Sequence, residues 1–180
     1  MVKVICISGK AQNGKDTTAQ YLDDYLWKHG KKPVIIHYAD LLKFICNKYF
    51  GWNGVKDDYG RTLLQKVGTD IVRKKEPNYW VNFVASLLRL FQDEWDYVII
   101  PDTRFPNEVN IFKDLMYDST HIRVVRTNFV SPLSEEQQKH PSETALDNVK
   151  PDITILNDSD LNSLYKKVAQ IGEDLINEEN

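Results

Sequence analysis

The segment VKVICISGKAQNGKDTT, residues 2–18, suggests the architecture of the whole chain. Its first seven residues form a short apolar, β-branched run that stops at Gly9, which is typical of a buried strand. Gly9, Gly14 and Lys15 have the spacing G-x-x-x-x-G-K of a phosphate-binding loop, and a helical stretch follows directly. Backbone N–H groups at such a helix start favour polyphosphates. The sequence therefore predicts a nucleoside triphosphate site, against the alternative of a glycine-containing turn with a solvated lysine.

The residues predicted to contact the nucleotide extend from the first glycine of the loop into the first helical turn. They are Gly9, Lys10, Asn13, Gly14, Lys15, Asp16 and Thr17. Asp16 stands where the usual pattern has a serine or threonine whose hydroxyl ligates magnesium. Its carboxylate either serves only the helix start, where the dipole favours it, or ligates Mg²⁺. We favour Asp16 near the metal and Thr17 on a phosphate oxygen.

Composition and charge argue against several classes of protein. The chain has 180 residues, 42% hydrophobic and 27% charged, which suits one soluble domain. A net charge of −3 argues against a broad nucleic-acid-binding surface. No stretch approaches the roughly 20 apolar residues of a membrane helix, and the N-terminal apolar run is too short for a signal peptide. Cys6 and Cys46 are the only cysteines, and Cys6, inside an apolar run, is expected to be a buried free thiol rather than part of a disulfide or metal site. We therefore expect a cytoplasmic protein, in the host cytoplasm if the source is viral.

Strands and helices are expected to alternate along the chain. The expected strands are 2–8, 33–39, 96–102, 121–127 and 152–157. The expected helices are 17–30, 40–51, 61–75, 78–94, 105–116 and 160–176. This order indicates an α/β fold, in which a mainly parallel five-stranded sheet is covered by helices on both faces.

Two segments interrupt the alternation. Residues 40–94 hold three successive expected helices, and residues 128–150 are polar with no expected strand. Both segments leave from the carboxyl edge of the sheet, where ligands bind in folds of this kind. They are therefore placed to cover a site at that edge.

Arginine is the side chain best suited to grip phosphate, because its planar fork binds oxyanions through two hydrogen bonds. Arg104 follows the third strand, and Arg126 ends the fourth. On one predicted helix, 3.6-residue periodicity places a polar stripe opposite an apolar face. The stripe is Arg61, Gln65, Thr69 and Arg73, and the apolar face is Leu63, Leu64, Val67 and Ile71. The stripe is either a solvated helix face or the wall of a pocket for a phosphate acceptor; beside the predicted loop we favour the pocket.

Two aspartates at strand ends have more than one interpretation. Asp102 follows an apolar strand, where it would either order magnesium or cap a turn before Pro106. Asp40, after the second strand, would serve as a helix N-cap, an acceptor contact or a general base. His140 is expected to be a loop histidine on the surface rather than a catalytic group.

Four motifs, taken together and in order, resemble a known family. They are GKAQNGKDTTA, RTLLQKVGTDIVR, DTRFPNE and HPSETAL…DITILN, and they span roughly residues 2–157. In this combination the chain resembles the deoxynucleoside monophosphate kinases known from phages, a branch of the P-loop nucleoside monophosphate kinases. The G-K-D-T variant of the loop and the D-x-R-F-P-N-E motif are the distinctive parts, so Asp16 fits the family pattern.

The resemblance implies ATP- and Mg²⁺-dependent phosphorylation of a (deoxy)nucleoside monophosphate to the diphosphate. It also implies a single P-loop kinase domain with an acceptor-binding insertion and a mobile lid. The core would be 1–39, 95–127 and 148–180, the insertion about 40–94 and the lid about 128–147. We expect a small-molecule nucleotide partner, no nucleic acid or membrane partner, and a homodimer as an option.

In this interpretation each candidate site residue has a role. The predicted catalytic residues are Lys15, Arg104 and Arg126. The predicted acceptor-binding residues are Asp40, Arg61, Gln65, Arg73, Asp102 and Arg104. The predicted metal ligands are Asp16 and Asp102, and the predicted cofactors are ATP and Mg²⁺.

Three rival interpretations remain open. The nearest is a P-loop kinase for another small acceptor, of the phosphomevalonate or dephospho-coenzyme A type, which needs the same arginines. A second is a non-catalytic nucleotide-binding module, but the sequence has no N-K-x-D motif for guanine. A third is an interaction protein built around the apolar stretch YWVNFVASLLRLF, 79–91, which is better interpreted as core or as a homodimer face.

Overall fold

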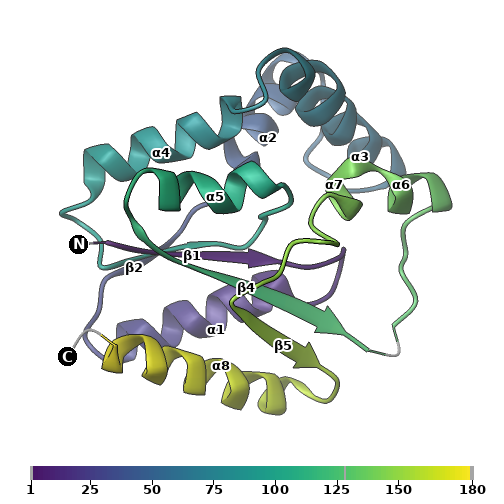
Figure 1. Cartoon of the computed structure of the whole chain (residues 1–180). Helices are drawn as coiled ribbons and strands as arrows, with labels where there is room; N and C mark the ends of the chain where they lie inside the picture. The colour runs from purple at the N-terminus through teal and green to yellow at the C-terminus, as the bar shows by residue number, and fades with distance from the viewer. Residues whose placement is uncertain (1, 128, 179–180) are drawn as a thin grey trace.

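The computed structural model describes residues 2–127 and 129–178, and a five-stranded sheet lies at its centre (Figure 1). The strands are β1 (Lys3–Ser8), β2 (Pro33–Ile35), β3 (Tyr97–Ile100), β4 (Asp118–Arg126) and β5 (Ile153–Asn157). Their order across the sheet is β2-β3-β1-β4-β5, and each neighbouring pair is parallel. The predicted α/β fold with a five-stranded parallel sheet is confirmed.

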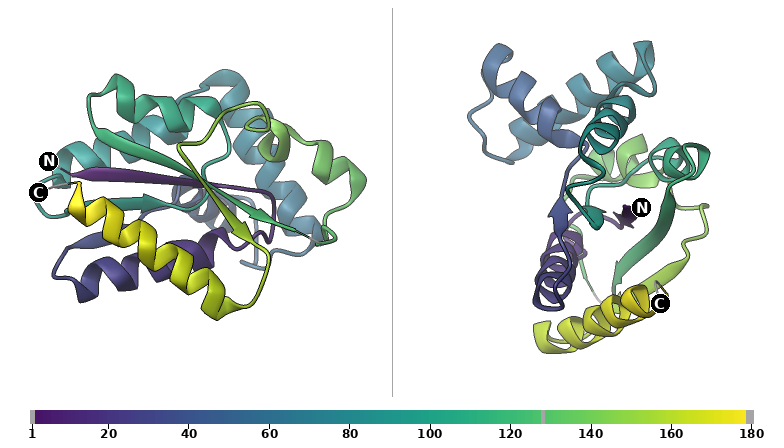
Figure 2. Two further views of the ribbon diagram at one scale, coloured as in Figure 1. Left: turned by 60° about the horizontal axis from the view of Figure 1, so that its bottom comes forward. Right: turned by 90° about the vertical axis from the view of Figure 1, so that its left-hand side faces the viewer.

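Helices cover both faces of the sheet, as expected (Figure 2). They are α1 (Lys15–Lys28), α2 (Ala39–Tyr49), α3 (Asp58–Gln65), the π-helix η1 (Lys66–Arg73), α4 (Tyr79–Phe91), α5 (Pro106–Asp114), α6 (Glu135–Lys139), α7 (Pro141–Thr144) and α8 (Leu161–Asn177). Helices α1 and α8 lie on one face and α4 and α5 on the other, while α3, α6 and α7 lie toward the carboxyl ends of the strands (Figure 1). Across the described ranges, every helix is too short or too polar to cross a bilayer.

The first strand is apolar throughout because both of its faces are covered. Ile5 and Ile7 belong to the core cluster under α1 and α8, whereas Val4 and Cys6 belong to the cluster under α4 and α5. Burying one such aliphatic side chain contributes roughly 2 kcal/mol. Cys6 is a buried free thiol, as the sequence predicts, and Cys46 is one as well.

The second strand is shorter than expected, and the helix after it begins earlier. β2 ends at Ile35, and α2 begins at Ala39 with Tyr38 at its N-cap position. The expectation that Asp40 caps this helix is therefore wrong. The cap comes from the turn after β3, because the Asp102 carboxylate accepts hydrogen bonds from the backbone N–H groups of Tyr38 and Ala39, both at 2.9 Å.

The expected helix over 61–75 is present but changes type along its length. α3 passes directly into η1, whose hydrogen bonds run from i to i+5. The wider turn advances fewer degrees per residue, so the apolar face shifts. Val72 packs against the core, whereas Ile71, expected there, is 36% exposed. Trp80 Nε1 donates to the carbonyl oxygen of Gly68 at 3.0 Å and anchors η1 to α4.

Candidate active site

The predicted phosphate-binding loop joins β1 to α1, and its shape requires both glycines. Gly9 and Gly14 have φ angles of +147° and +99°, which favour glycine. A Cβ on Gly9 would lie 2.3 Å from the carbonyl oxygen of Val124, and one on Gly14 would lie 2.7 Å from Asn157 Nδ2. The buried Asn13 side chain donates to the same Val124 oxygen at 3.2 Å. That side chain therefore braces the loop instead of facing a ligand.

Lys15 folds back across the loop. Its Nζ donates to the carbonyl oxygen of Lys10 at 2.8 Å, and the residue is 8% exposed. Burial, followed by the positive charge of Arg104, lowers the pKa of Lys15 to about 8, and the charge of Glu143 opposes that shift. The ammonium group therefore lies inside the loop, where the sequence predicts phosphates.

Two cavities meet at the start of α1. The α8-side cavity, of about 560 Å³, is bounded by the loop, the end of β5 and the start of α8. The insertion-side cavity, of about 450 Å³, is bounded by the loop, α2, α3 and η1. Gln12, Lys15 and Asp16 line both cavities, so these residues mark the junction.

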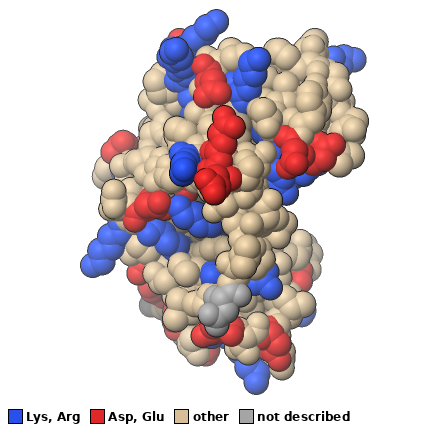
Figure 3. All heavy atoms as spheres, turned by 90° about the vertical axis from the view of Figure 1, so that its right-hand side faces the viewer, with Lys and Arg blue, Asp and Glu red and all other residues tan. Residues whose placement is uncertain are grey.

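The polar stripe predicted on the helix faces the insertion-side cavity. Arg61, Gln65, Thr69 and Arg73 all line it, although the second half of the stripe lies on a π-helix. Arg104 and Asp102 line the same cavity. Figure 3 shows this edge of the molecule, where basic and acidic side chains are mixed. Charges of both signs therefore lie close together at this edge (Figure 3).

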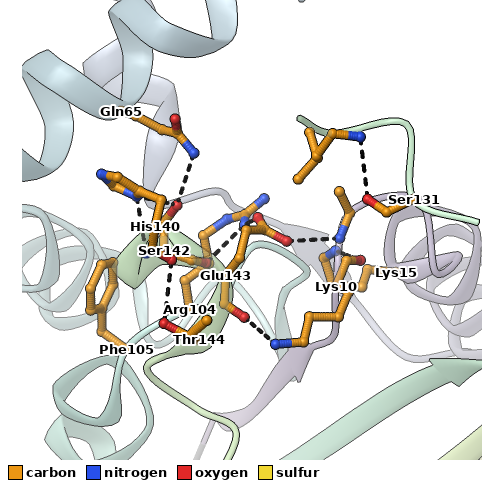
Figure 4. Close-up of polar contacts among 12 residues, drawn as sticks. Lys10, Lys15, Gln65, Arg104, Phe105, Ser131, His140, Ser142, Glu143 and Thr144 are labelled. Atoms are coloured by element: carbon orange, nitrogen blue, oxygen red, sulfur yellow. Dashed lines mark hydrogen bonds and ion pairs between the residues drawn. The ribbon is translucent and has the colours of Figure 1, made fainter. Parts of the chain in front are cut away.

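The three arginines of this cavity differ in what they contact. Arg73 forms an ion pair with Glu108 and stacks on the ring of Phe105, 4.0 Å from guanidinium carbon to centroid. Arg104 forms an ion pair with Glu143 (Figure 4). The Arg61 side chain has no hydrogen-bond or ion-pair partner within the described ranges 2–127 and 129–178. Its charge is therefore available to an incoming anion.

Glu108 belongs to this site, although it is not among the site residues predicted from the sequence. Its side chain is 1% exposed and accepts hydrogen bonds from the backbone N–H groups of Arg104 and Phe105. The signal that could have found it is the start of α5, where Pro106 opens the helix and a glutamate reaches back from the third position. Glu108 therefore fixes both the backbone at Arg104 and the side chain of Arg73.

Burial raises the pKa of Glu108 from 4.5 to about 7, against the opposing charge of Arg73. The folded protein thus binds the carboxyl proton of Glu108 more tightly than the unfolded chain does. The stability gained from binding this proton is therefore full below pH 4.5 and is lost as the pH rises through about 7. We expect the unfolding free energy of wild type, relative to Glu108→Gln, to fall across this window by up to about 3 kcal/mol. Urea titrations at several pH values measure it, and parallel profiles for the two proteins would contradict it. Glutamine resembles the protonated carboxyl group, so the variant lacks this titration; the ion pair with Arg73 exists only in the ionised form and already acts to lower the pKa of Glu108.

The candidate metal ligands lie at the rim of the site. The Asp16 side chain is 82% exposed, with its Oδ1 3.9 Å from His37 Nε2, a contact that lowers the pKa of Asp16 and raises that of His37. Asp102 is held by its two hydrogen bonds to the start of α2. The described residues hold no cluster of three or more His, Cys, Asp or Glu side chains suited to a metal. Asp40 does not line either cavity and contacts Lys43 at 3.0 Å.

Arg126 lies apart from the other candidate arginines. It lines the α8-side cavity, donates to the carbonyl oxygen of Gln12 at 3.4 Å, and stacks on Phe129 at 4.6 Å. His140 is less exposed than the surface position expected for it: its side chain is 16% exposed, and its Nδ1 accepts from the N–H of Ser142 at the start of α7. The structure therefore places Arg104 and Arg126 at different cavities, and Lys15 lines both of these cavities.

Comparison with known protein families shows to which family this chain belongs. The family model described as "Deoxynucleotide monophosphate kinase" matches residues 51–168, more than half of the chain. The chain belongs to the deoxynucleotide monophosphate kinase family. This match covers the insertion from residue 51 onward, the segment with Arg104 and Glu108, and α7. It does not include the phosphate-binding loop, which rests on the geometry described above.

Viral and animal proteins are among the relatives of this member of the deoxynucleotide monophosphate kinase family. It is 34% identical to the deoxynucleotide monophosphate kinase of Enterobacteria phage T4 over 119 residues, which are 64% of this chain and 46% of the phage protein. It is 30% identical to a putative deoxynucleotide monophosphate kinase of Acanthamoeba polyphaga mimivirus, covering 93% of this chain and 94% of that protein. It is 26% identical to the phosphomevalonate kinase of Drosophila melanogaster over 63% of this chain and 61% of that protein.

The fold of this family member is shared with solved kinases. The APS kinase CysC of Mycobacterium tuberculosis, in complex with AMPPNP and APS, matches with a TM-score of 0.52 at 14% identity, covering 96% of this chain and 98% of that one. At that identity the likeness concerns the fold alone. The chain spans about half the length of the phage relatives that it matches.

Proposed function

We propose that this chain is an ATP-dependent kinase that transfers the γ-phosphoryl group of ATP to a (deoxy)nucleoside monophosphate and releases the diphosphate. The observation that carries the proposal is the meeting of two cavities at one phosphate-binding loop, with Lys15 at the junction. A donor and an acceptor that enter from the two sides of this lysine have their phosphates next to each other. Phosphoryl transfer depends mainly on that positioning and on electrostatics, so no covalent intermediate is needed.

The α8-side cavity suits the donor. Its walls include Thr17 at the start of α1 and the turn that leads into α8. The loop amides and Lys15 would hold the triphosphate at the helix start. Because Arg126 lines this cavity, we assign it to donor binding in place of the transfer role predicted from the sequence.

The insertion-side cavity suits the acceptor. Arg61, which is unpaired among the described residues, would hold the acceptor phosphate, and the Gln65 amide would hydrogen-bond to the base edge. Leu64 and Trp80 supply apolar wall for a flat base. Arg104 would stabilise the charge of the group in transfer, and the segment 128–147 would act as a lid that excludes water.

The rim of the site also fits a magnesium ion. Mg²⁺ is usually bound through one or two carboxylates together with substrate phosphates, so a dedicated cluster of protein ligands is not required. The exposed carboxylate of Asp16, at the junction of the cavities, would hold it, with Asp102 nearby at the insertion side. The ion would neutralise part of the charge of the triphosphate.

A panel of acceptors tests the proposal. ADP release from ATP is measured in a coupled assay with each ribo- and deoxynucleoside monophosphate in turn. The expected result is stimulation by at least one deoxynucleoside monophosphate. If no monophosphate stimulates ADP release and phosphomevalonate does, the acceptor assignment is wrong. That second candidate is favoured by the similarity to the Drosophila phosphomevalonate kinase.

Replacing Arg61 with alanine is expected to raise the KM for the acceptor by about 10- to 100-fold, because a charge-assisted hydrogen bond contributes about 1.5–3 kcal/mol. The KM for ATP should stay within about twofold, since this arginine lines the insertion-side cavity only. Lys66→Ala, an exposed cation on the same helical segment, is the matched control. Equal changes in both KM values would remove Arg61 from the acceptor site.

A further inference from the structure

Glu143 lies where α7 touches the phosphate-binding loop. His140 caps the short helix through its Nδ1, which accepts from the N–H of Ser142 at 3.2 Å. From the loop, Lys10 donates to the carbonyl oxygen of Glu143 and forms an ion pair with Asp147. The backbone of α7 is therefore tied to the loop at this point, and the Glu143 side chain, 6% exposed, is directed into the site (Figure 4).

The two oxygens of this carboxylate bind different parts of the site. Oε2 accepts from the backbone N–H of Ala11 in the loop at 3.0 Å. Oε1 forms the ion pair with Nη1 of Arg104, and the same nitrogen donates to the carbonyl oxygen of Ser142 at 3.0 Å. One buried side chain thus connects the loop, α7 and the arginine that lines the insertion-side cavity.

This arrangement leaves most of the Arg104 fork unused. An arginine has five N–H donors on three nitrogens. In the described part of the chain, Nη1 is the nitrogen of this side chain with protein partners, and Nη2 and Nε have none. Because the guanidinium is held through Nη1, its Nη2 and Nε donors remain available to a ligand. Arg104 lines the insertion-side cavity, where such a ligand would bind.

We propose that Glu143 is a positioning residue of the transfer step, which holds Arg104 and the Ala11 N–H group ready for the transferring phosphoryl group. This inference rests on the proposed kinase function. The competing idea is that the carboxylate only occupies the place of a phosphate oxygen and leaves when ATP binds. The two ideas predict different effects of this charge on ATP affinity. If the carboxylate only occupied a phosphate position, removing its negative charge would strengthen ATP binding by Coulomb's law, whereas a positioning residue would leave ATP binding nearly unchanged.

The test uses Glu143→Gln, which keeps the size of the side chain and removes its charge. We expect kcat to fall about 10- to 100-fold, the usual effect of a misplaced catalytic group. The Kd of a non-hydrolysable ATP analogue, measured by calorimetry, should change less than about threefold. Glu173→Gln, an exposed glutamate of α8 outside the proposed lid, is the matched control. Unchanged kcat overturns the proposal, whether the variant binds the analogue more tightly or only melts at a lower temperature.

A double-mutant cycle shows whether Glu143 acts through Arg104. In an Arg104→Lys background, Glu143→Gln should lower kcat by less than about threefold, because the residue that it positions has already been altered. Full additivity overturns the proposal. The same cycle on ATP hydrolysis without acceptor separates the two claims, since water then replaces the acceptor. If the two substitutions are coupled in ATP hydrolysis but no monophosphate accepts a phosphoryl group, the kinase assignment is wrong and the positioning role of Glu143 stands.

Discussion

Replacing Lys15 with alanine is expected to lower kcat by about 1,000-fold, because the ammonium is a preorganised donor in a largely water-excluded site. It lies inside the loop at the junction of both cavities, where donor and acceptor phosphates would approach each other. Its pKa of about 8 keeps it mostly charged at pH 7, so the loss is one of a cation and not of a neutral amine. The melting temperature should not fall, because burial of the ammonium group is itself unfavourable.

Steady-state kinetics and thermal unfolding of the same samples measure both parts of this expectation. Lys28→Ala is the matched control, since Lys28 is exposed at the far end of the same helix, α1. It should behave as wild type in both measurements. Transfer that persists within about tenfold of wild type in Lys15→Ala would remove this lysine from the mechanism.

Replacing Arg104 with alanine is expected to lower kcat by about 1,000-fold or more, the effect of losing an arginine that stabilises a transferring phosphoryl group. The variant also leaves the buried Glu143 carboxylate without its cation. Because Arg104 is itself 31% exposed, we expect a stability loss of about 1–3 kcal/mol, less than for a fully buried pair.

Arg104→Lys separates the charge from the shape of the group. A lysine restores a point charge but not the planar fork, so kcat should recover in part and stability more fully. Arg89→Ala, an exposed arginine on α4, controls for loss of positive charge. If Arg104→Ala loses stability but keeps kcat, the arginine is a structural tie between α5 and α7.

The fold and the loop could be predicted because their signals lie in short stretches of sequence. The apolar run of β1, the spacing of Gly9, Gly14 and Lys15, and the helical stripe of Arg61 and Gln65 each fall within one segment. The boundary errors come from contacts across the chain. Asp102 caps α2 from the turn after β3, and the π-helix η1 shifts the apolar face away from Ile71.

The sequence by itself determined the order of strands and helices, the sheet class and the position of the loop, because periodicity and glycine spacing act over neighbouring residues. Only the tertiary structure decided which cations remain available in the site. It pairs Arg73 with Glu108 and Arg104 with Glu143, while the side chain of Arg61 has no partner among the residues described. Ion pairing at this edge depends on which distant segments the parallel sheet brings together, and no local pattern of residues encodes that.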